Sequence, residues 1–81
     1  MSDTQQLYAI INMLEERLAY NEQGLRQLKQ EEYLKMHQIT PERSVLIKEK
    51  ITGRVDEDRS ILAEVCNLLP PSDPKYIFIE G

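Results

Sequence analysis

Apolar residues recur along the first third of the chain at spacings of four and three, the repeat of a helix that packs against another helix. The repeating positions are Leu7, Ile11, Leu14, Leu18, Asn21, Leu25, Leu28 and Glu32. Thr4 is a good N-cap residue, and no proline interrupts the chain before Pro41. The pattern therefore predicts a first helix over about residues 4–36.

A second stretch repeats the same spacing further along the chain. Its repeating positions are Ile51, Val55, Asp58, Leu62, Val65 and Leu69. Thr40 is again a favourable N-cap, and Pro41 suits the first position of a helix, whereas Pro70 and Pro71 cannot continue one. We expect a single domain over 1–81, with a turn at 37–40, a second helix over about 41–69 and an extended tail over 70–81.

A turn of only four residues makes two long helices antiparallel neighbours. If the chain folds back near residue 39 or 40, facing residues have numbers that add up to about 79 or 80. This rule places Ile11 opposite Leu69 and Leu28 opposite Ile51. Because two separate repeats agree on one alignment, the sequence predicts an all-α fold, a long antiparallel hairpin of coiled-coil type.

The polar members of the two repeats also fall opposite each other. Asn21 faces Asp58, and Glu32 faces Lys48. A buried polar layer lowers stability but penalises alignments in which it would meet leucine, so these four residues are candidates for specifying the register. A solvated gap between the helices is the alternative interpretation of the Asn21–Asp58 layer.

Two aligned repeats do not account for every apolar side chain near the open end of the hairpin. The remaining apolar residues there are Tyr8, Ile10, Ile61, Cys66 and Leu68. An isolated hairpin would leave them exposed, and patches of this kind usually mark an interface. We therefore expect two hairpins to dimerise into a four-helix bundle through these residues.

The end of the chain is apolar and β-prone where a tail is ordinarily polar. Tyr76, Ile77, Phe78 and Ile79 follow the turn at Ser72 to Pro74. These four residues are predicted to contact a second copy or a target protein. The alternative is that the tail folds onto its own hairpin near Leu7 and Tyr8.

Composition narrows the classes of protein that remain. The chain has 81 residues, 41% apolar, with a net charge of −4 and one cysteine. A core of this size is marginal, which favours oligomerisation, and no apolar run approaches the roughly 20 residues of a membrane span. The lone Cys66 and the absence of a signal sequence indicate the cytoplasm.

No set of residues has the spacing of a catalytic or ligand-binding motif. His37 and Cys66, the soft metal ligands, fall at opposite ends of the predicted hairpin. Adjacent carboxylates such as Glu15 and Glu16 diverge around a helix. We therefore expect no metal, no cofactor and no enzymatic activity.

Charge is uneven along the chain, with seven basic and four acidic residues between positions 26 and 54. The candidates for nucleic-acid contact in this half are Lys29, Lys35, Arg43, Lys50 and Arg54. Interleaved acids and the lack of an aromatic-basic surface count against that function. The favoured hypothesis is an adaptor, inhibitor or chaperone-like accessory factor, of the kind a phage or mobile element encodes, that binds another protein and itself.

Overall fold

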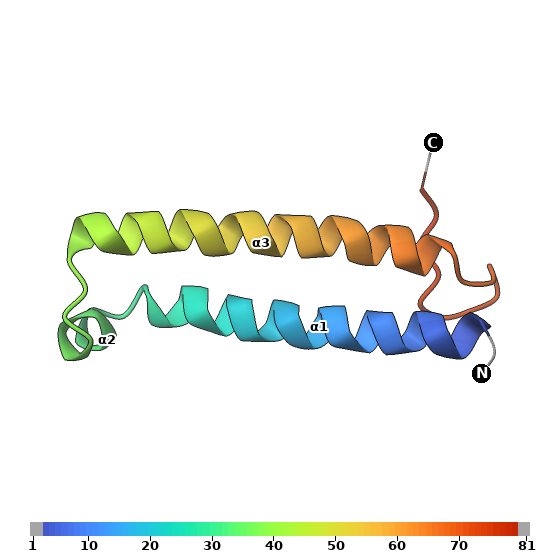
Figure 1. Ribbon diagram of the computed structural model, residues 1–81, viewed down its shortest axis with the longest axis horizontal. Coiled ribbons are helices and arrows are strands. Elements are labelled where there is room, and N and C mark those ends of the chain that lie inside the picture. Colours follow the sequence, from blue (N-terminus) through green and yellow to red (C-terminus); the bar gives the residue numbers. More distant parts are fainter. Residues whose placement is uncertain (1–2, 80–81) are drawn as a thin grey trace.

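Two long helices lie side by side and antiparallel in the computed structural model, which describes residues 3–79 (Figure 1). They are α1 (Asp3–Gln27) and α3 (Pro41–Asn67), and a short helix, α2 (Glu31–Met36), lies between them at the turn end. The molecule measures 48 × 27 × 17 Å, and the described residues contain no strand. The predicted antiparallel helical hairpin is confirmed.

None of the helices in this part of the chain is both long enough and apolar enough to cross a membrane.

The apolar residues of α1 and α3 meet along the contact between the two helices. At the open end, Ile11, Cys66 and Leu69 form a buried cluster. Nearer the turn, Leu28 and Val55 are also buried. A single apolar layer thus joins the helices along most of their length.

The predicted start of the second helix is confirmed. Thr40 is the N-cap of α3, and its hydroxyl accepts a hydrogen bond of 3.2 Å from the backbone N–H of Arg43. Pro41 occupies the first helical position, where its missing N–H leaves no partner unsatisfied. The helix ends at Asn67, two residues before the predicted boundary, and Leu68 and Leu69 continue it with tighter three-residue hydrogen bonds.

The prediction of one continuous helix over 4–36 is wrong. α1 ends at Gln27, where Lys29 and Gln30 donate to carbonyls three residues back, and Gln30 is extended with φ −93° and ψ 119°. A continued helix would have turned Glu32 toward α3. The break leaves Glu32 exposed and lets Tyr33 and Leu34 become half-buried instead. Burial of apolar side chains therefore accounts for the change of direction.

The end of α2 closes the turn. Gln38 has φ 55°, the left-handed conformation that usually follows a helix at glycine. The Ile39 N–H donates to Leu34 at 2.8 Å and the Gln38 N–H donates to Lys35 at 3.2 Å, the pair of bonds that closes a helix end in this way. The chain can therefore enter α3 directly at Thr40.

Candidate interaction surface

The segment after α3 folds back over one side of the hairpin. The Tyr8 hydroxyl donates a hydrogen bond of 2.6 Å to the Asp73 carboxylate, and Lys75 Nζ forms an ion pair of 2.7 Å with Glu15. Asn67 donates from its side chain to the Ile77 carbonyl at 3.0 Å. These contacts span residues 73–77, so the tail is held to its own hairpin by polar groups.

The Tyr8–Asp73 contact changes the acidity of both groups. The hydrogen bond to the carboxylate, helped by desolvation, raises the pKa of the Tyr8 hydroxyl. The same bond, with a second from the Lys75 backbone N–H at 2.9 Å, lowers the pKa of Asp73. Both shifts favour the neutral tyrosine and the charged aspartate at neutral pH, the state in which the bond forms.

Ion pairs between α1 and α3 show which sides of the two helices lie next to each other. Glu22 of α1 meets Arg59 of α3 at 2.6 Å, on the side where Glu15 and Tyr8 hold the tail. We call this side the tail-covered face. Arg17 meets Asp58 at 2.7 Å, and the helical repeat places both on the other side of the contact between the helices.

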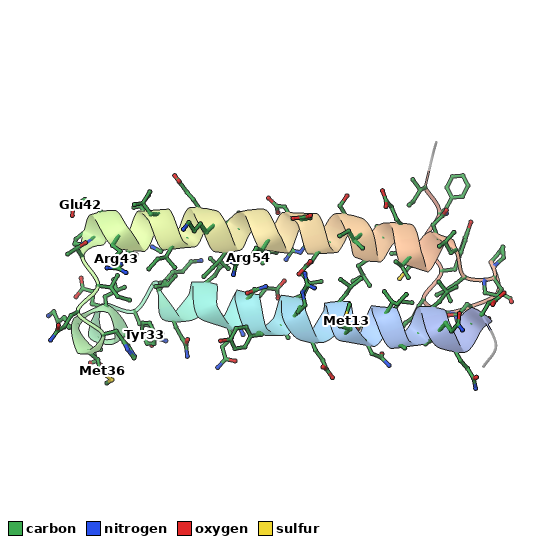
Figure 2. All side chains as sticks on the ribbon, in the orientation of Figure 1. Met13, Tyr33, Met36, Glu42, Arg43 and Arg54 are labelled. Atoms are coloured by element: carbon green, nitrogen blue, oxygen red, sulfur yellow. The ribbon has the colours of Figure 1, made fainter. Side chains whose placement is uncertain are left out.

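The side marked by Arg17 and Asp58 is apolar along both helices, and none of the tail contacts found among residues 3–79 falls on it. We call it the open face. On α1 it follows Arg17 at spacings of three and four through Ile10, Met13 and Tyr20. Their side chains remain 41%, 49% and 78% exposed. Figure 2 shows Met13 on α1 and, on α3, Arg54, which belongs to the same face.

On α3 the open face consists of residues that share the side of Asp58. They are Ile47, Ile51, Arg54, Ile61 and Leu68. Ile61 and Leu68 are 38% and 67% exposed. Both helices thus present exposed apolar side chains on the same face of the hairpin, and within residues 3–79 nothing packs over them.

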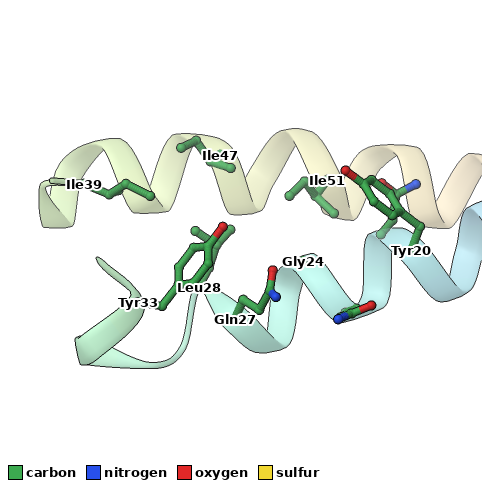
Figure 3. A pocket seen from close by; sticks show the side chains of 10 residues that line it. Tyr20, Gly24, Gln27, Leu28, Tyr33, Ile39, Ile47 and Ile51 are labelled. Atoms are coloured by element: carbon green, nitrogen blue, oxygen red, sulfur yellow. The ribbon is translucent and has the colours of Figure 1, made fainter. Parts of the chain in front are cut away.

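A groove of about 330 Å³ lies at the turn end of the open face. Side chains from the end of α1, from α2 and from α3 converge there (Figure 3). Its apolar and aromatic lining includes Tyr20, Leu28, Tyr33, Ile39, Ile47 and Ile51, with amides from Asn21, Gln23 and Gln27. The repeat of apolar residues does not predict this groove, because the groove requires the break between α1 and α2.

The polar register pair differs from the prediction. Asp58 is buried as expected, but its partner is Arg17, one helical turn before Asn21. Asn21 is half-buried beside the groove. Because Asp58 sits on the open-face edge of the seam, a long side chain from that edge reaches it more easily than the short amide of Asn21. Its second oxygen, Oδ2, is buried without a hydrogen-bond partner.

The other predicted polar layer is not formed. Glu32 is exposed on α2, Lys48 is half-buried on α3, and neither belongs to the three ion pairs found among residues 3–79. The turn away from α3 after Leu28 removes Glu32 from the seam. The alignment at the open end is as predicted, since Ile11 and Leu69 belong to one core cluster. The predicted pairing of Leu28 with Ile51 is wrong, because Gly24, one helical turn earlier, lies against Ile51 instead.

The predicted interface residues fall into two groups. Ile10, Ile61, Leu68, Ile77, Phe78 and Ile79 are exposed, with Phe78 at 72%. Tyr8 and Tyr76 are half-buried, and Cys66 is 4% exposed within the core. Assigning Cys66 to an interface was wrong, because it packs between Ile11 and the end of α3. Burial also raises the pKa of its thiol, and the Glu15 carboxylate acts in the same direction.

The five candidate residues for nucleic-acid contact are exposed around the turn half. Lys29 and Lys35 lie beside and within α2, while Arg43, Lys50 and Arg54 follow α3. None of the five takes part in an ion pair within the described chain.

The described residues were also compared with the requirements of a metal site. No three side chains of the histidine, cysteine, aspartate and glutamate types come together as a possible metal site. The ring of His37 packs against that of Tyr33, with 4.3 Å between the ring centroids and an angle of 42° between the ring planes. Comparison of the chain with protein-family models, curated proteins and solved structures found no match.

Proposed function

We propose that this chain is a small, non-enzymatic protein–protein interaction module that self-associates through its open face. Two hairpins would pair as a homodimer and form a four-helix bundle. The module would act in the cytoplasm as an adaptor, inhibitor or chaperone-like accessory factor. The observation that carries the proposal is the difference between the two faces of the hairpin.

At the open end of the hairpin, the tail itself occupies the tail-covered face through Tyr8–Asp73 and Glu15–Lys75. The open face instead exposes Ile10, Met13, Tyr20, Ile61 and Leu68. A face of this apolar character, running along both helices, is typical of an association surface. Burial of a large aliphatic side chain contributes about 1.5–3 kcal/mol, so a few such residues support a stable dimer.

The tail supplies a second surface for a target protein. Asn67 holds the backbone at Ile77, while the side chains of Ile77, Phe78 and Ile79 remain exposed. Figure 1 shows the end of the described chain beyond α3, turned away from α1. We propose them as the contact with another protein.

Nucleic-acid binding is the second candidate. Arg43, Lys50 and Arg54 are exposed and have no carboxylate partner among residues 3–79. Each lies within four residues of Ile47 or Ile51, which line the aromatic groove. Glu57 and Glu64 continue the same side of α3 with negative charge, which restricts the basic surface to one half of the molecule. A salt-dependent shift assay on generic DNA and RNA distinguishes the two functions, since phosphate contacts weaken steeply with salt.

Sedimentation equilibrium at micromolar concentration tests the self-association. We expect the wild type to sediment at twice the 9.5 kDa mass of the chain. Replacing Ile61 by glutamate puts a charge on the open face and should weaken the dimer at least about tenfold.

The matched control is Val45→Glu, an exposed apolar residue of the same helix that lines a shallow hollow on its other side. This variant should change the dimer dissociation constant less than about twofold. A wild type that stays at 9.5 kDa would refute self-association. A larger effect of Val45→Glu than of Ile61→Glu would move the interface to the other face.

A further inference from the structure

Four charged residues follow one line on α3 that flanks the open-face residues, on the side farther from α1. Arg43, Lys50, Glu57 and Glu64 are separated by seven residues each, so they share one side of the helix. All four are exposed, and none takes part in an ion pair among the described residues. The line is basic toward the turn end and acidic toward the open end.

A line with this order of charges is complementary to itself when reversed. If α3 of one copy packs antiparallel against α3 of another, Arg43 meets Glu64 and Lys50 meets Glu57, and each pair occurs twice about the two-fold axis. The residue numbers of both pairs add up to the same value, 107, so one alignment satisfies all four contacts.

The apolar residues beside this line agree with the same alignment. Ile47 and Ile61 are seven residues on either side of Arg54, so the reversed pairing brings Ile47 of one copy next to Ile61 of the other. The exposed Leu68 at the open end of one copy reaches the turn end of the other, where the groove of about 330 Å³ lies beside Ile39. The open end of each hairpin therefore covers the exposed groove of its partner.

The other symmetric way to stack two open faces places the hairpins parallel, with α3 over α1 of the second copy. In that arrangement Lys50 meets the region of Gln27, and Glu64 meets the region of Met13. No opposite charges are matched. From this difference we propose that the occupant of the open face is a second copy in the antiparallel orientation, with α3 paired to α3. The inference rests on the proposed self-association.

A charge-exchange series tests the orientation, with dissociation constants from sedimentation equilibrium at low salt. The double variant Arg43→Glu/Lys50→Glu makes the whole line acidic, and Glu57→Lys/Glu64→Lys makes it basic. Each should weaken self-association at least about tenfold. An equimolar mixture of the two should form a heterodimer close to wild-type strength.

The matched control carries all four substitutions in one chain. Its line is again complementary to itself when reversed, so its homodimer should be within about threefold of the wild type. Circular dichroism of each variant checks that the helices remain formed. A dimeric wild type whose double variants associate equally well would overturn the antiparallel orientation alone. A monomeric wild type would instead remove the proposed self-association on which it rests.

Discussion

The contact between α1 and α3 contains one buried carboxylate. Asp58 is 2% exposed, and one of its oxygens has no hydrogen-bond partner. Its charge is balanced by Arg17, whose side chain is 57% exposed. An unpaired buried charge is costly, whereas a buried pair seldom adds net stability. We therefore interpret this ion pair as satisfying Asp58, not as a main source of stability.

Removal of Arg17 should reveal this cost. In an Ile61→Glu background, which avoids effects of self-association, Arg17→Met should lower the free energy of unfolding by about 1–3 kcal/mol. Water reaches the exposed arginine, so the loss is smaller than the roughly 3–5 kcal/mol of a fully buried pair. The double variant Arg17→Met/Asp58→Leu should be at least as stable as the background. Urea unfolding measures the free energy of unfolding of the single and the double variant against that of the background.

Arg59→Met provides the comparison, because it breaks the exposed pair with Glu22 and should cost less than about 1 kcal/mol. Equal losses for Arg17→Met and Arg59→Met would contradict the assignment of Asp58 as a charge that depends on its partner.

The sequence correctly predicted that Asp58 is a buried polar residue, but the predicted partner, Asn21, was wrong. Pairing residues by their numbers along the two repeats does not take into account how far a long side chain such as that of Arg17 can reach.

At the level of elements, the break between α1 and α2 distinguishes the structure from its sequence pattern. Glu31 is the first residue of α2, the preceding Gln30 is already extended, and the Glu31 N–H takes part in none of the backbone bonds of this turn. Proline is favoured at the first position of a helix, and the residue before a proline is usually extended.

We therefore expect Glu31→Pro to change the free energy of unfolding by less than about 1 kcal/mol. A continuous helix over 4–36 would lose about 3 kcal/mol or more from the same change. Glu16→Pro, an exposed position inside α1, is the matched variant and should show that full loss. Thermal and urea unfolding of the two proteins give the comparison. Similar destabilisation by both prolines would mean that the helix continues through residue 31 in solution.

Strong local signals account for the elements that could be predicted. Thr40 and Pro41 specify the start of α3, and the regular repeat specifies which sides of α1 and α3 meet. The break after Gln27 has no proline or glycine to mark it, and only the acidic pair Glu31–Glu32 suits a new helix start. The groove depends on that break. For this reason neither it nor the role of Tyr33 could be predicted from spacing alone.

For the whole molecule, the tail decides which face remains free. Its contacts to Tyr8, Glu15 and Asn67 occupy one side, so the apolar residues of the other side remain for association. The spacing of the charged residues from Arg43 to Glu64 can be read from the sequence. Its relevance to self-association can be argued only once the structure shows which face of the hairpin is open. Tail, ion pairs and charge order together therefore favour a dimer of one face and one orientation.

The proposed antiparallel dimer makes a specific prediction for the residue at its centre. Arg54 lies midway between Ile47 and Ile61, so the proposed two-fold axis would bring the two copies of its guanidinium close together. Like charges in an interface oppose association, and their repulsion falls with added salt. Arg54→Gln should therefore strengthen the dimer about two- to fivefold at low ionic strength, with a smaller gain at high salt.

Arg26→Gln removes an exposed charge from the other side of α1 and should leave the dissociation constant within about twofold of the wild type. Sedimentation equilibrium at two salt concentrations compares both variants with the wild type. In the parallel arrangement Arg54 would instead face the region of Gly24, with no like charge opposite it, and its replacement would bring no gain. An unchanged or weaker Arg54→Gln dimer would therefore contradict the two-fold axis at this residue, even if the wild type is a dimer.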